Sequence, residues 1–359
     1  MAYEIDFLPV GDGERSGDAI ALRFGNLQMG DQTVVTIDGG TKESGEALVQ
    51  HIKTFYRTET VDAAICTHSD ADHASGLTEV LESLDVRKLF MHLPWQHAEN
   101  IDDLFKDPRV TANSIMTRFK KSLDNAHELA SLAEKKGIPV VEPFSDTITA
   151  NDSWAVLSPS TGFYEALLLE FRAAPEPKAE NILRKAVGVV KDVVTTVAEN
   201  WNIETLAEPE ADDCSAENNS SAVLLFKDAE SQFLFTSDAG VPALAEAIAC
   251  ARGLNIDLSV VKGIQVPHHG SKHNVGPAAL NLLLGPKRQD AVYPKTAIVS
   301  AAKYGEPRHP SKKVVNAFMR RGARVFATQG KALWHHSSDA PYRSWGSATP
   351  LPFSPQVEE

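Results

Sequence analysis

The sequence predicts an α/β fold, and three observations lead to that prediction. Short apolar segments of strand-like character alternate along the chain with amphipathic segments whose apolar residues recur at helical spacing. Asp or His residues follow at least four of the expected strands, which is where sites form in open α/β sheets. The 359 residues are 43% hydrophobic and 23% charged, which suffices for one large core or, by length alone, for two domains.

The first part of the chain alternates strands and helices. Residues 3–10 alternate apolar and polar side chains and end at a Gly-Asp-Gly turn. The strand expected at 33–37 ends in Asp38-Gly39-Gly40, where glycines allow another backbone to approach closely. The expected strands are 3–10, 18–24, 33–37, 61–66, 87–93, 138–141 and 153–157, and the expected helices are 45–56, a run from 77 to 84, and 110–136.

Residues 160–217 depart from this rhythm and are expected to form a helical insertion that ends in an acidic connector. Such an insertion would act as a lid or a dimer contact, or would simply pack as a pair of helices. The rhythm then resumes with a hairpin of strands 222–226 and 232–236, a helix at 241–251, strands at 259–264 and 296–300, a helix at 311–321 and a hairpin of 324–328 with 331–336. We therefore expect one domain over residues 1–340 and a loosely packed C-terminal tail over 341–359.

The most informative stretch is His68-Ser69-Asp70-Ala71-Asp72-His73. It occupies a loop between an apolar strand and an amphipathic helix. Imidazole and carboxylate groups form a borderline-to-hard ligand set that suits zinc, iron or manganese. The four side chains His68, Asp70, Asp72 and His73 are more than one tetrahedral ion needs from a single loop, so they predict two neighbouring ions. The alternative is a polar surface loop with incidental histidines. That alternative would explain a lone His-x-Asp, but it explains the full His-x-Asp-x-Asp-His string less well.

Three further segments carry Asp or His just beyond a strand end. Asp238 follows the strand at 232–236, the pair His268-His269 follows 259–264, and His309 follows 296–300. Strand ends that are distant in sequence can meet at one edge of a sheet, so we expect a dinuclear site built from these loops together.

Charge and cysteine content exclude several classes of protein. The formal net charge of −13 argues against a protein that coats nucleic acid non-specifically, because such binding depends on Lys and Arg. The three cysteines, Cys66, Cys214 and Cys250, show neither a disulfide framework nor a zinc-finger spacing, which indicates a reducing compartment and a cytoplasmic location. The start of the chain lacks the features of a signal peptide, and no apolar run approaches the ~20 residues of a spanning helix, so no membrane association is expected.

The chain resembles the metallo-β-lactamase superfamily. Within it, the chain is similar to the branch that includes the hydrolase domain of the bacterial competence channel ComEC and its stand-alone relatives. Five stretches carry the resemblance, with His309 as a weaker sixth: TIDGG at 36–40, THSDADH at 67–73, NNSS at 218–221, FTSDAG at 235–240 and VPHHGS at 266–271. The resemblance implies a four-layered αββα sandwich for the domain, and a metal-dependent hydrolase with a dinuclear site and a bridging hydroxide that acts on phosphodiester bonds, as a nuclease or a small-molecule phosphodiesterase.

The resemblance also implies a ligand set. Asp238 would bridge two divalent ions, with His68 and Asp70 on one ion and Asp72, His73 and His309 on the other. One of His268 and His269 would join the first ion, and His269 is preferred because it lies next to a glycine. Zinc is expected first, and manganese is the alternative because Asp70 and Asp72 make the site harder than a three-histidine site.

The chain departs from the commonest superfamily pattern in two places. Asp70 stands where a second histidine is usual, and Asn218-Asn219 stand where many relatives supply another histidine. The branch shares both departures, so they indicate a variant site, with the missing nitrogen supplied by the His268-His269 pair. Asn218 or Asn219 would then orient a ligand or cap the loop.

The residues expected to act in catalysis are Asp72, Asp238 and Lys272. Lys272 could meet a substrate phosphate, with a solvated lysine as the alternative. The one basic run of the chain flanks His309 and could bind phosphate, although a helix with a solvated basic side is the commoner explanation: Lys303, Arg308, Lys312, Lys313, Arg320, Arg321 and Arg324.

Three functions therefore remain in competition. The first is a phosphodiester hydrolase, whose partner would be a phosphodiester substrate, with nucleic acid among the candidates. The second is a hydrolase of acyl substrates such as a lactone, thioester or β-lactam, because the same ions serve either chemistry. The third is a non-catalytic binding module that a metal stabilises. A homo-oligomer is compatible with all three.

Overall fold

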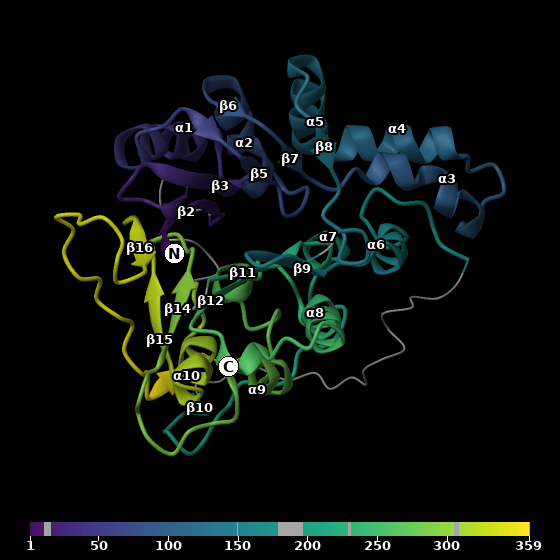
Figure 1. Cartoon of the computed structure of the whole chain (residues 1–359). Helices are drawn as coiled ribbons and strands as arrows, with labels where there is room; N and C mark the ends of the chain where they lie inside the picture. The colour runs from purple at the N-terminus through teal and green to yellow at the C-terminus, as the bar shows by residue number, and fades with distance from the viewer. Residues whose placement is uncertain (11–15, 149, 179–196, 229–230, 305–308, 359) are drawn as a thin grey trace.

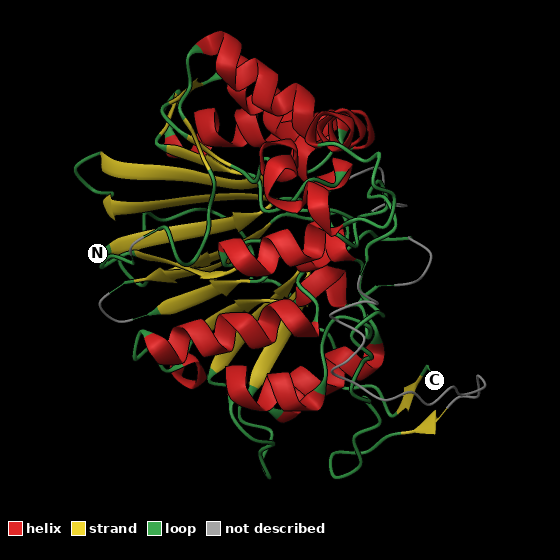
Figure 2. Cartoon of the chain, turned by 90° about the vertical axis from the view of Figure 1, so that its right-hand side faces the viewer, coloured by secondary structure: helices red, strands yellow, loops and turns green. Residues whose placement is uncertain are grey.

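The computed structural model describes residues 1–10, 16–148, 150–178, 197–228, 231–304 and 309–358. Two β-sheets lie face to face, and helices cover their outer faces (Figures 1 and 2). The described chain therefore has four layers in the order helix, sheet, sheet, helix. This confirms the predicted α/β class and the sandwich that the resemblance implies. No helix in the described ranges has both the length and the apolar character needed to cross a membrane.

The first sheet contains seven strands in the order β16-β1-β2-β3-β5-β7-β8. Their bounds are β16 (Leu333–His336), β1 (Ala2–Phe7), β2 (Ala19–Asn26), β3 (Asp31–Gly39), β5 (Ala63–Ile65), β7 (Leu89–Phe90) and β8 (Val140–Val141). Its outer face packs against α1 (Lys42–His51), α2 (Ala71–Ser83), α4 (Ala112–Ser122) and α5 (Asp124–Lys136). Buried residues of these helices, such as Leu77 and Phe119, join residues of the sheet in one apolar cluster.

The second sheet contains six strands in the order β15-β14-β13-β12-β11-β9. Their bounds are β15 (Ala323–Ala327), β14 (Lys295–Val299), β13 (Gly263–Gln265), β12 (Gln232–Phe235), β11 (Val223–Lys227) and β9 (Trp154–Ser158). Strands β12 to β15 are parallel, and their outer face packs against α8 (Val241–Gly253), α9 (Pro277–Leu284) and α10 (Lys312–Arg320).

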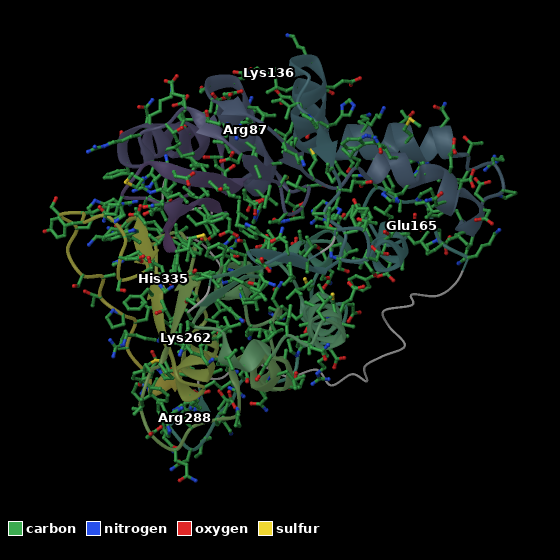
Figure 3. All side chains as sticks on the ribbon, in the orientation of Figure 1. Arg87, Lys136, Glu165, Lys262, Arg288 and His335 are labelled. Atoms are coloured by element: carbon green, nitrogen blue, oxygen red, sulfur yellow. The ribbon has the colours of Figure 1, made fainter. Side chains whose placement is uncertain are left out.

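Aromatic side chains fill the space between the two sheets. Phe7 of the first sheet lies 5.9 Å from Phe233 and 6.4 Å from Phe235 of the second, measured between ring centroids. Side chains pack between every pair of layers, with Arg87 and Lys136 at one end of the molecule and Arg288 at the other (Figure 3). The sheets are thus joined by a dry apolar layer, and polar side chains gather where the strands end.

Three glycines hold α2 against the end of β3 and against α1. A Cβ atom on Gly76 would lie 1.9 Å from the carbonyl oxygen of Gly39, and one on Gly45 would lie 2.2 Å from that of Gly76. No side chain fits in such a contact. The close approach that the Asp38-Gly39-Gly40 turn predicts is therefore present, and it fixes the loop that precedes α2.

Several predicted elements differ from the structure. The helix expected at 110–136 is two helices, α4 and α5, separated at Leu123, and the helix expected at 45–56 is α1 followed by a π-helical turn, Ile52–Tyr56. The hairpin expected at 324–336 is wrong, because β15 belongs to the second sheet whereas β16 pairs with β1 in the first. The short pairs β4 (Thr60–Val61) with β6 (Asp85–Val86), and β10 (Val197–Ala198) with β17 (Gln356–Val357), form two further sheets.

The insertion expected at 160–217 contains α6 (Thr161–Leu168), and the acidic connector leads into α7 (Ala216–Asn219). Its second expected helix falls almost wholly within residues 179–196, which lie outside the described residues. The remaining short helix, α3 (Ala98–Ile101), lies near α4.

The C-terminal tail, most of whose residues are exposed, is held at Arg343. Arg343 is buried and donates to Asp6 at 2.7 Å, and its guanidinium lies 2.9 Å from Glu4. The same group lies 4.8 Å above the ring of Trp334. Buried carboxylates on β1 thus provide partners for one residue of the tail.

Candidate metal centre

The polar residues that follow the strands of both sheets meet at one edge of the sandwich. The loop after β5 carries His68 and Asp70, and the first turn of α2 carries Asp72 and His73, which the sequence placed in a loop. The loop after β12 carries Asp238, and the turn after β13 carries His268 and His269. Backbone hydrogen bonds join these loops: Ala222 N donates to the Thr67 carbonyl at 2.9 Å, and His268 N donates to the Ser237 carbonyl at 2.9 Å. The loops from the two sheets therefore form one site.

Asp238 lies at the centre of four imidazole rings. Its Oδ2 is 3.5 Å from Nε2 of His73, 3.6 Å from Nε2 of His268 and 3.9 Å from Nε2 of His68. Its Oδ1 is 3.8 Å from Nε2 of His269. These spacings exceed a hydrogen bond, yet they are short enough for a cation that both groups ligate.

The other nitrogen of each ring already has an acceptor. The Thr67 hydroxyl donates to Asp38, so its lone pairs face His68. The four contacts of Nδ1 are His73 to Asp38 Oδ2 at 2.8 Å, His269 to the Ser300 carbonyl at 2.8 Å, His268 to Asn274 Oδ1 at 2.9 Å and His68 to the Thr67 hydroxyl at 3.3 Å. In the neutral ring, an Nδ1 that donates leaves the lone pair on Nε2, and this is the form of imidazole that binds metals.

Two acidic residues of the motif complete the set. Asp72, His73 and His269 place one ligand atom each within 4.8 Å of one another, and so do Asp238, His268 and His269. Asp70 Oδ2 lies 3.9 Å from Nε2 of His68, and the Asp70 side chain is 30% exposed. Asp70 therefore lies on the solvent side of the site.

Backbone strain concentrates at this site. Seven non-glycine residues in the described parts of the chain have positive φ angles, and four of them are Asp38, Ser237, His268 and His269. Such conformations cost on the order of 1–3 kcal/mol each and persist where the surroundings enforce them. The turn after β13 uses two of them in succession, with φ of 43° and 56°, to direct adjacent imidazoles at the same carboxylate.

The site has a negative electrostatic character. Burial by itself raises the pKa of Asp238, but the imidazoles of His268, His269 and His73 reverse this and hold the pKa well below its usual range. Burial lowers the pKa of His73, whereas Asp238 and Asp38 raise it well above its usual range. Five carboxylates lie in or beside the site, and their negative charge suits a divalent cation: Asp18, Asp38, Asp70, Asp72 and Asp238.

The donor set fits the metal ions that the sequence predicts. Nε2 of His68, His73 and His269 and Oδ1 of Asp238 are buried and have no hydrogen-bond partner among the described residues. Buried polar atoms without partners are rare, and here they converge on one space. Divalent cations bound in this space would supply the missing interactions.

Two predicted site residues lie at the margin. His309 is half-buried, its ring centroid is 6.3 Å from that of His268, and burial with the neighbouring His269 and His268 lowers its pKa to about 4. His309 belongs to none of the metal-ligand groups found among the described residues. The residue that lies with Asp72 and His73, where His309 was expected, is His269. Lys272 is half-buried and directly follows the turn.

The two asparagines lie in the loop beside the site. Asn219 is fully buried and donates to the carbonyls of Cys214 and Ser215, while the Asn218 amide nitrogen lies 3.4 Å from Nδ1 of His268. This geometry fits the orienting and capping role expected of them.

The basic run near His309 does not form one solvated face. Arg320 and Arg321 are buried and pair with Glu199 at 2.9 Å and with Glu204 at 2.6 Å. His97 contacts Glu142 and Glu165 (labelled in Figure 3). Arg320, Arg321 and His97 thus have acidic partners within the protein.

Sequence reasoning missed three residues of the site. Asp18 is buried, its pKa is raised by burial, and it accepts a hydrogen bond from Gln265 at 2.8 Å. Gln265 in turn accepts from the backbone of Thr236 and Ser237, which precede Asp238. Asn274 contacts both His268 and Asp238. Asp18 begins the predicted strand 18–24, and Gln265 and Asn274 follow the predicted strand 259–264. Position next to a strand is a weak signal when the hydrogen-bond partners are not known.

Comparisons with known proteins agree with this architecture. The family model described as metallo-beta-lactamase superfamily matches residues 14–116. ComE operon protein 3 of Bacillus subtilis (strain 168) is 30% identical over 159 residues, which is 43% of this chain and 19% of that protein, so the chain spans less than a fifth of its length.

Two solved structures are similar to the chain at low sequence identity. The metallo-beta-lactamase fold protein YhfI from Bacillus subtilis has a TM-score of 0.43 and 8% identity, covering 94% of this chain and 100% of that one. Tm1679, described as a metal-dependent hydrolase of the beta-lactamase superfamily, has a TM-score of 0.43 and 12% identity, with 94% and 100% covered.

Proposed function

We propose that the chain, in which residues 14–116 match the metallo-beta-lactamase superfamily model, is a metal-dependent hydrolase of phosphodiester bonds. One observation carries the proposal: four imidazole nitrogens converge on the Asp238 carboxylate at 3.5–3.9 Å. Members of the superfamily are metal-dependent hydrolases. The arrangement has the donors and the charge to hold two divalent ions and lies at the edge of the sheets.

The residues divide into two ion sites that share Asp238. The first would use His68, Asp70 and His268, and the second would use Asp72, His73 and His269. This differs from the sequence-based assignment, in which His309 took the place that His269 takes here. Zinc is the first candidate metal and manganese the second, since three carboxylates with four imidazoles are harder than an all-nitrogen site.

Two ions at such a site supply hydroxide near neutral pH and neutralise charge on a phosphate. The chain's own residues provide the setting for that chemistry. Asp238 stays ionised, because the surrounding imidazoles keep its pKa low. His309 stays neutral at pH 7, because its pKa is lowered to about 4, so its ring can donate a hydrogen bond to a substrate oxygen without adding charge.

The choice of phosphodiester substrates rests on two supports. The motifs resemble the branch of the ComEC hydrolase domain, and one partly covered relative is ComE operon protein 3. Lys272 at the margin offers a cation for a phosphate oxygen. Nucleic acid is one such substrate, and a cytoplasmic location would agree with the free cysteines Cys66, Cys214 and Cys250.

The test is the hydrolysis of bis-p-nitrophenyl phosphate by wild type and by Asp238→Asn. We expect turnover by the wild type with added zinc or manganese and a loss of at least ~100-fold in the variant, because the shared carboxylate is removed. Asp290→Asn, at an exposed position, serves as the matched control. Circular dichroism verifies that each variant is folded.

The same assay separates the competing functions. Equal activity in Asp238→Asn and wild type refutes the proposal. Turnover of a lactone, thioester or β-lactam without turnover of any phosphodiester assigns the site to acyl substrates. Stoichiometric metal without turnover of either class identifies a metal-stabilised binding module.

A further inference from the structure

We propose that Asn274 is a positioning residue that directs the His268 ring toward Asp238 and so completes one of the two ion sites. This inference rests on the proposed metal-dependent function. Asn274 is 1% exposed and lies six residues after His268, between the strained turn and α9. Its side chain makes three hydrogen bonds, and each one involves the candidate metal centre or its immediate support.

The orientation of the Asn274 amide follows from its partners. The main-chain carbonyl of Asp238 can only accept, and it lies 2.9 Å from the Asn274 side-chain nitrogen, which therefore donates to it. The side-chain oxygen consequently faces Nδ1 of His268, at 2.9 Å. An amide oxygen can only accept, so Nδ1 carries the proton and Nε2 is left with the lone pair that faces Asp238.

His268 depends on this contact more than the other histidines depend on theirs. Its side chain is 31% exposed, compared with 5% for His269 and 0% for His68 and His73. Packing therefore restricts its ring least. The Asn218 amide is the other group near Nδ1, and at 3.4 Å it is at the long limit of a hydrogen bond. Asn274 is thus the main group that fixes the tautomer and the direction of this ring.

Asn274 also joins the turn to the loop that carries Asp238. Besides the Asp238 carbonyl, its nitrogen donates to Sγ of Cys214 at 3.2 Å. Cys214 packs beside Gly240, where a Cβ would lie 2.7 Å from its sulfur. One side chain therefore fixes the spacing between His268 and Asp238.

Two substitutions separate the acceptor function of Asn274 from its donor function. Asn274→Ala removes all three bonds. Asn274→Asp keeps an oxygen acceptor for Nδ1 of His268 but loses both donated bonds. The matched control is Asn316→Ala: Asn316 is also fully buried and donates to Glu199 at 2.7 Å and to the Ser354 carbonyl at 2.8 Å, away from the described metal centre.

The primary measurement is zinc binding, by elemental analysis and by competition with a chromophoric chelator. Losing an outer contact to a ligand typically costs ~10–100-fold in metal affinity. We expect Asn274→Ala to lose that much at one of the two ion sites only, Asn274→Asp to recover most of it, and Asn316→Ala to bind two ions as the wild type does.

A second measurement reports the tautomer directly in metal-free protein. Proteins with ¹⁵N-labelled histidine give distinct shifts for protonated and unprotonated ring nitrogens, and His268→Gln identifies the resonances of His268. We expect the Nδ1-protonated form in the wild type and in Asn274→Asp, and a shift away from it in Asn274→Ala. A purely structural role for Asn274 would not produce this pattern.

Wild-type zinc affinity in Asn274→Ala overturns the proposal, and so does an equal loss in both Asn274 variants or in Asn316→Ala. An unchanged His268 tautomer in Asn274→Ala also overturns it. The proposed function fails separately, if the wild type binds two ions but cleaves no phosphodiester, and the zinc and tautomer results then still decide the role of Asn274.

Discussion

Replacing His92 with phenylalanine should make the protein more resistant to mild acid. His92 follows β7, is 2% exposed, and stacks on Tyr164 at 4.6 Å between ring centroids. Burial, together with the nearby His97 and His68, lowers its pKa to about 3. Neither ring nitrogen has a hydrogen-bond partner among the described residues. The folded protein therefore keeps this imidazole neutral at pH values where the unfolded chain binds a proton.

The direction and size of the effect follow from linkage. Between pH 6.5 and 3 the unfolded chain carries one more proton at this site than the folded protein, so the free energy of unfolding falls as the pH decreases. From an unfolded pKa of ~6.5, lowering the pH from 7.5 to 5 costs about 2 kcal/mol at this one residue. His92→Phe keeps the aromatic stack and removes that cost. It also removes two unpaired polar atoms, so it should not destabilise the protein at pH 7.5.

The assay is urea unfolding of chelated protein at pH 5 and at pH 7.5, followed by circular dichroism. Chelation removes the pH dependence of metal binding from both proteins. Tyr164→Phe is the control, because the Tyr164 hydroxyl lacks a described partner in the same cluster, while burial raises its pKa far above this range. A pH-dependent loss of stability in His92→Phe equal to that of the wild type would refute the reasoning.

Four further substitutions test the site and the tail. His269→Ala should lose at least one ion by elemental analysis, whereas Asn219→Ala should keep both and lose activity; the reverse pattern would make the asparagine a ligand. Gln265→Leu leaves two buried backbone N–H groups unpaired, so urea unfolding should show a loss of about 2–5 kcal/mol in stability. Arg343→Met leaves two buried carboxylates of β1 without this partner and should destabilise the protein by about 3–5 kcal/mol, as measured by the same method; a change below 1 kcal/mol would contradict it.

Much of the fold could be predicted, because each strand and helix has a local pattern. The position of the candidate metal centre could be predicted for a related reason. Asp and His residues that directly follow apolar strands lie at the edge of the sheet, where the ends of several strands meet. Sheet membership could not be predicted in the same way. Strands β15 and β16 are separated by a Gly-containing turn, as in a hairpin, and only their distant partners show that the chain passes from one sheet to the other.

Residue-level detail depended on contacts between distant segments. Nothing local in the sequence indicates that Arg320 would find Glu199, so a basic run was considered as a phosphate-binding face. The choice between His268 and His269 could not be made from spacing for another reason. Both residues adopt left-handed backbone conformations, which direct the two rings at the same carboxylate, and spacing alone does not reveal that geometry.

The crossing of the chain from β15 to β16 has a consequence for synthesis on the ribosome. β1 needs a partner on each side, and one of them begins at Leu333, more than 300 residues later. At 5–20 residues per second, β1 waits roughly 15–70 s for that neighbour. Throughout this interval one edge of the first strand has open hydrogen-bonding groups and can pair with another nascent chain. Chaperones and substitutions in β16 should therefore change the solubility of the protein during expression. Their effect on the stability of the folded protein should be smaller.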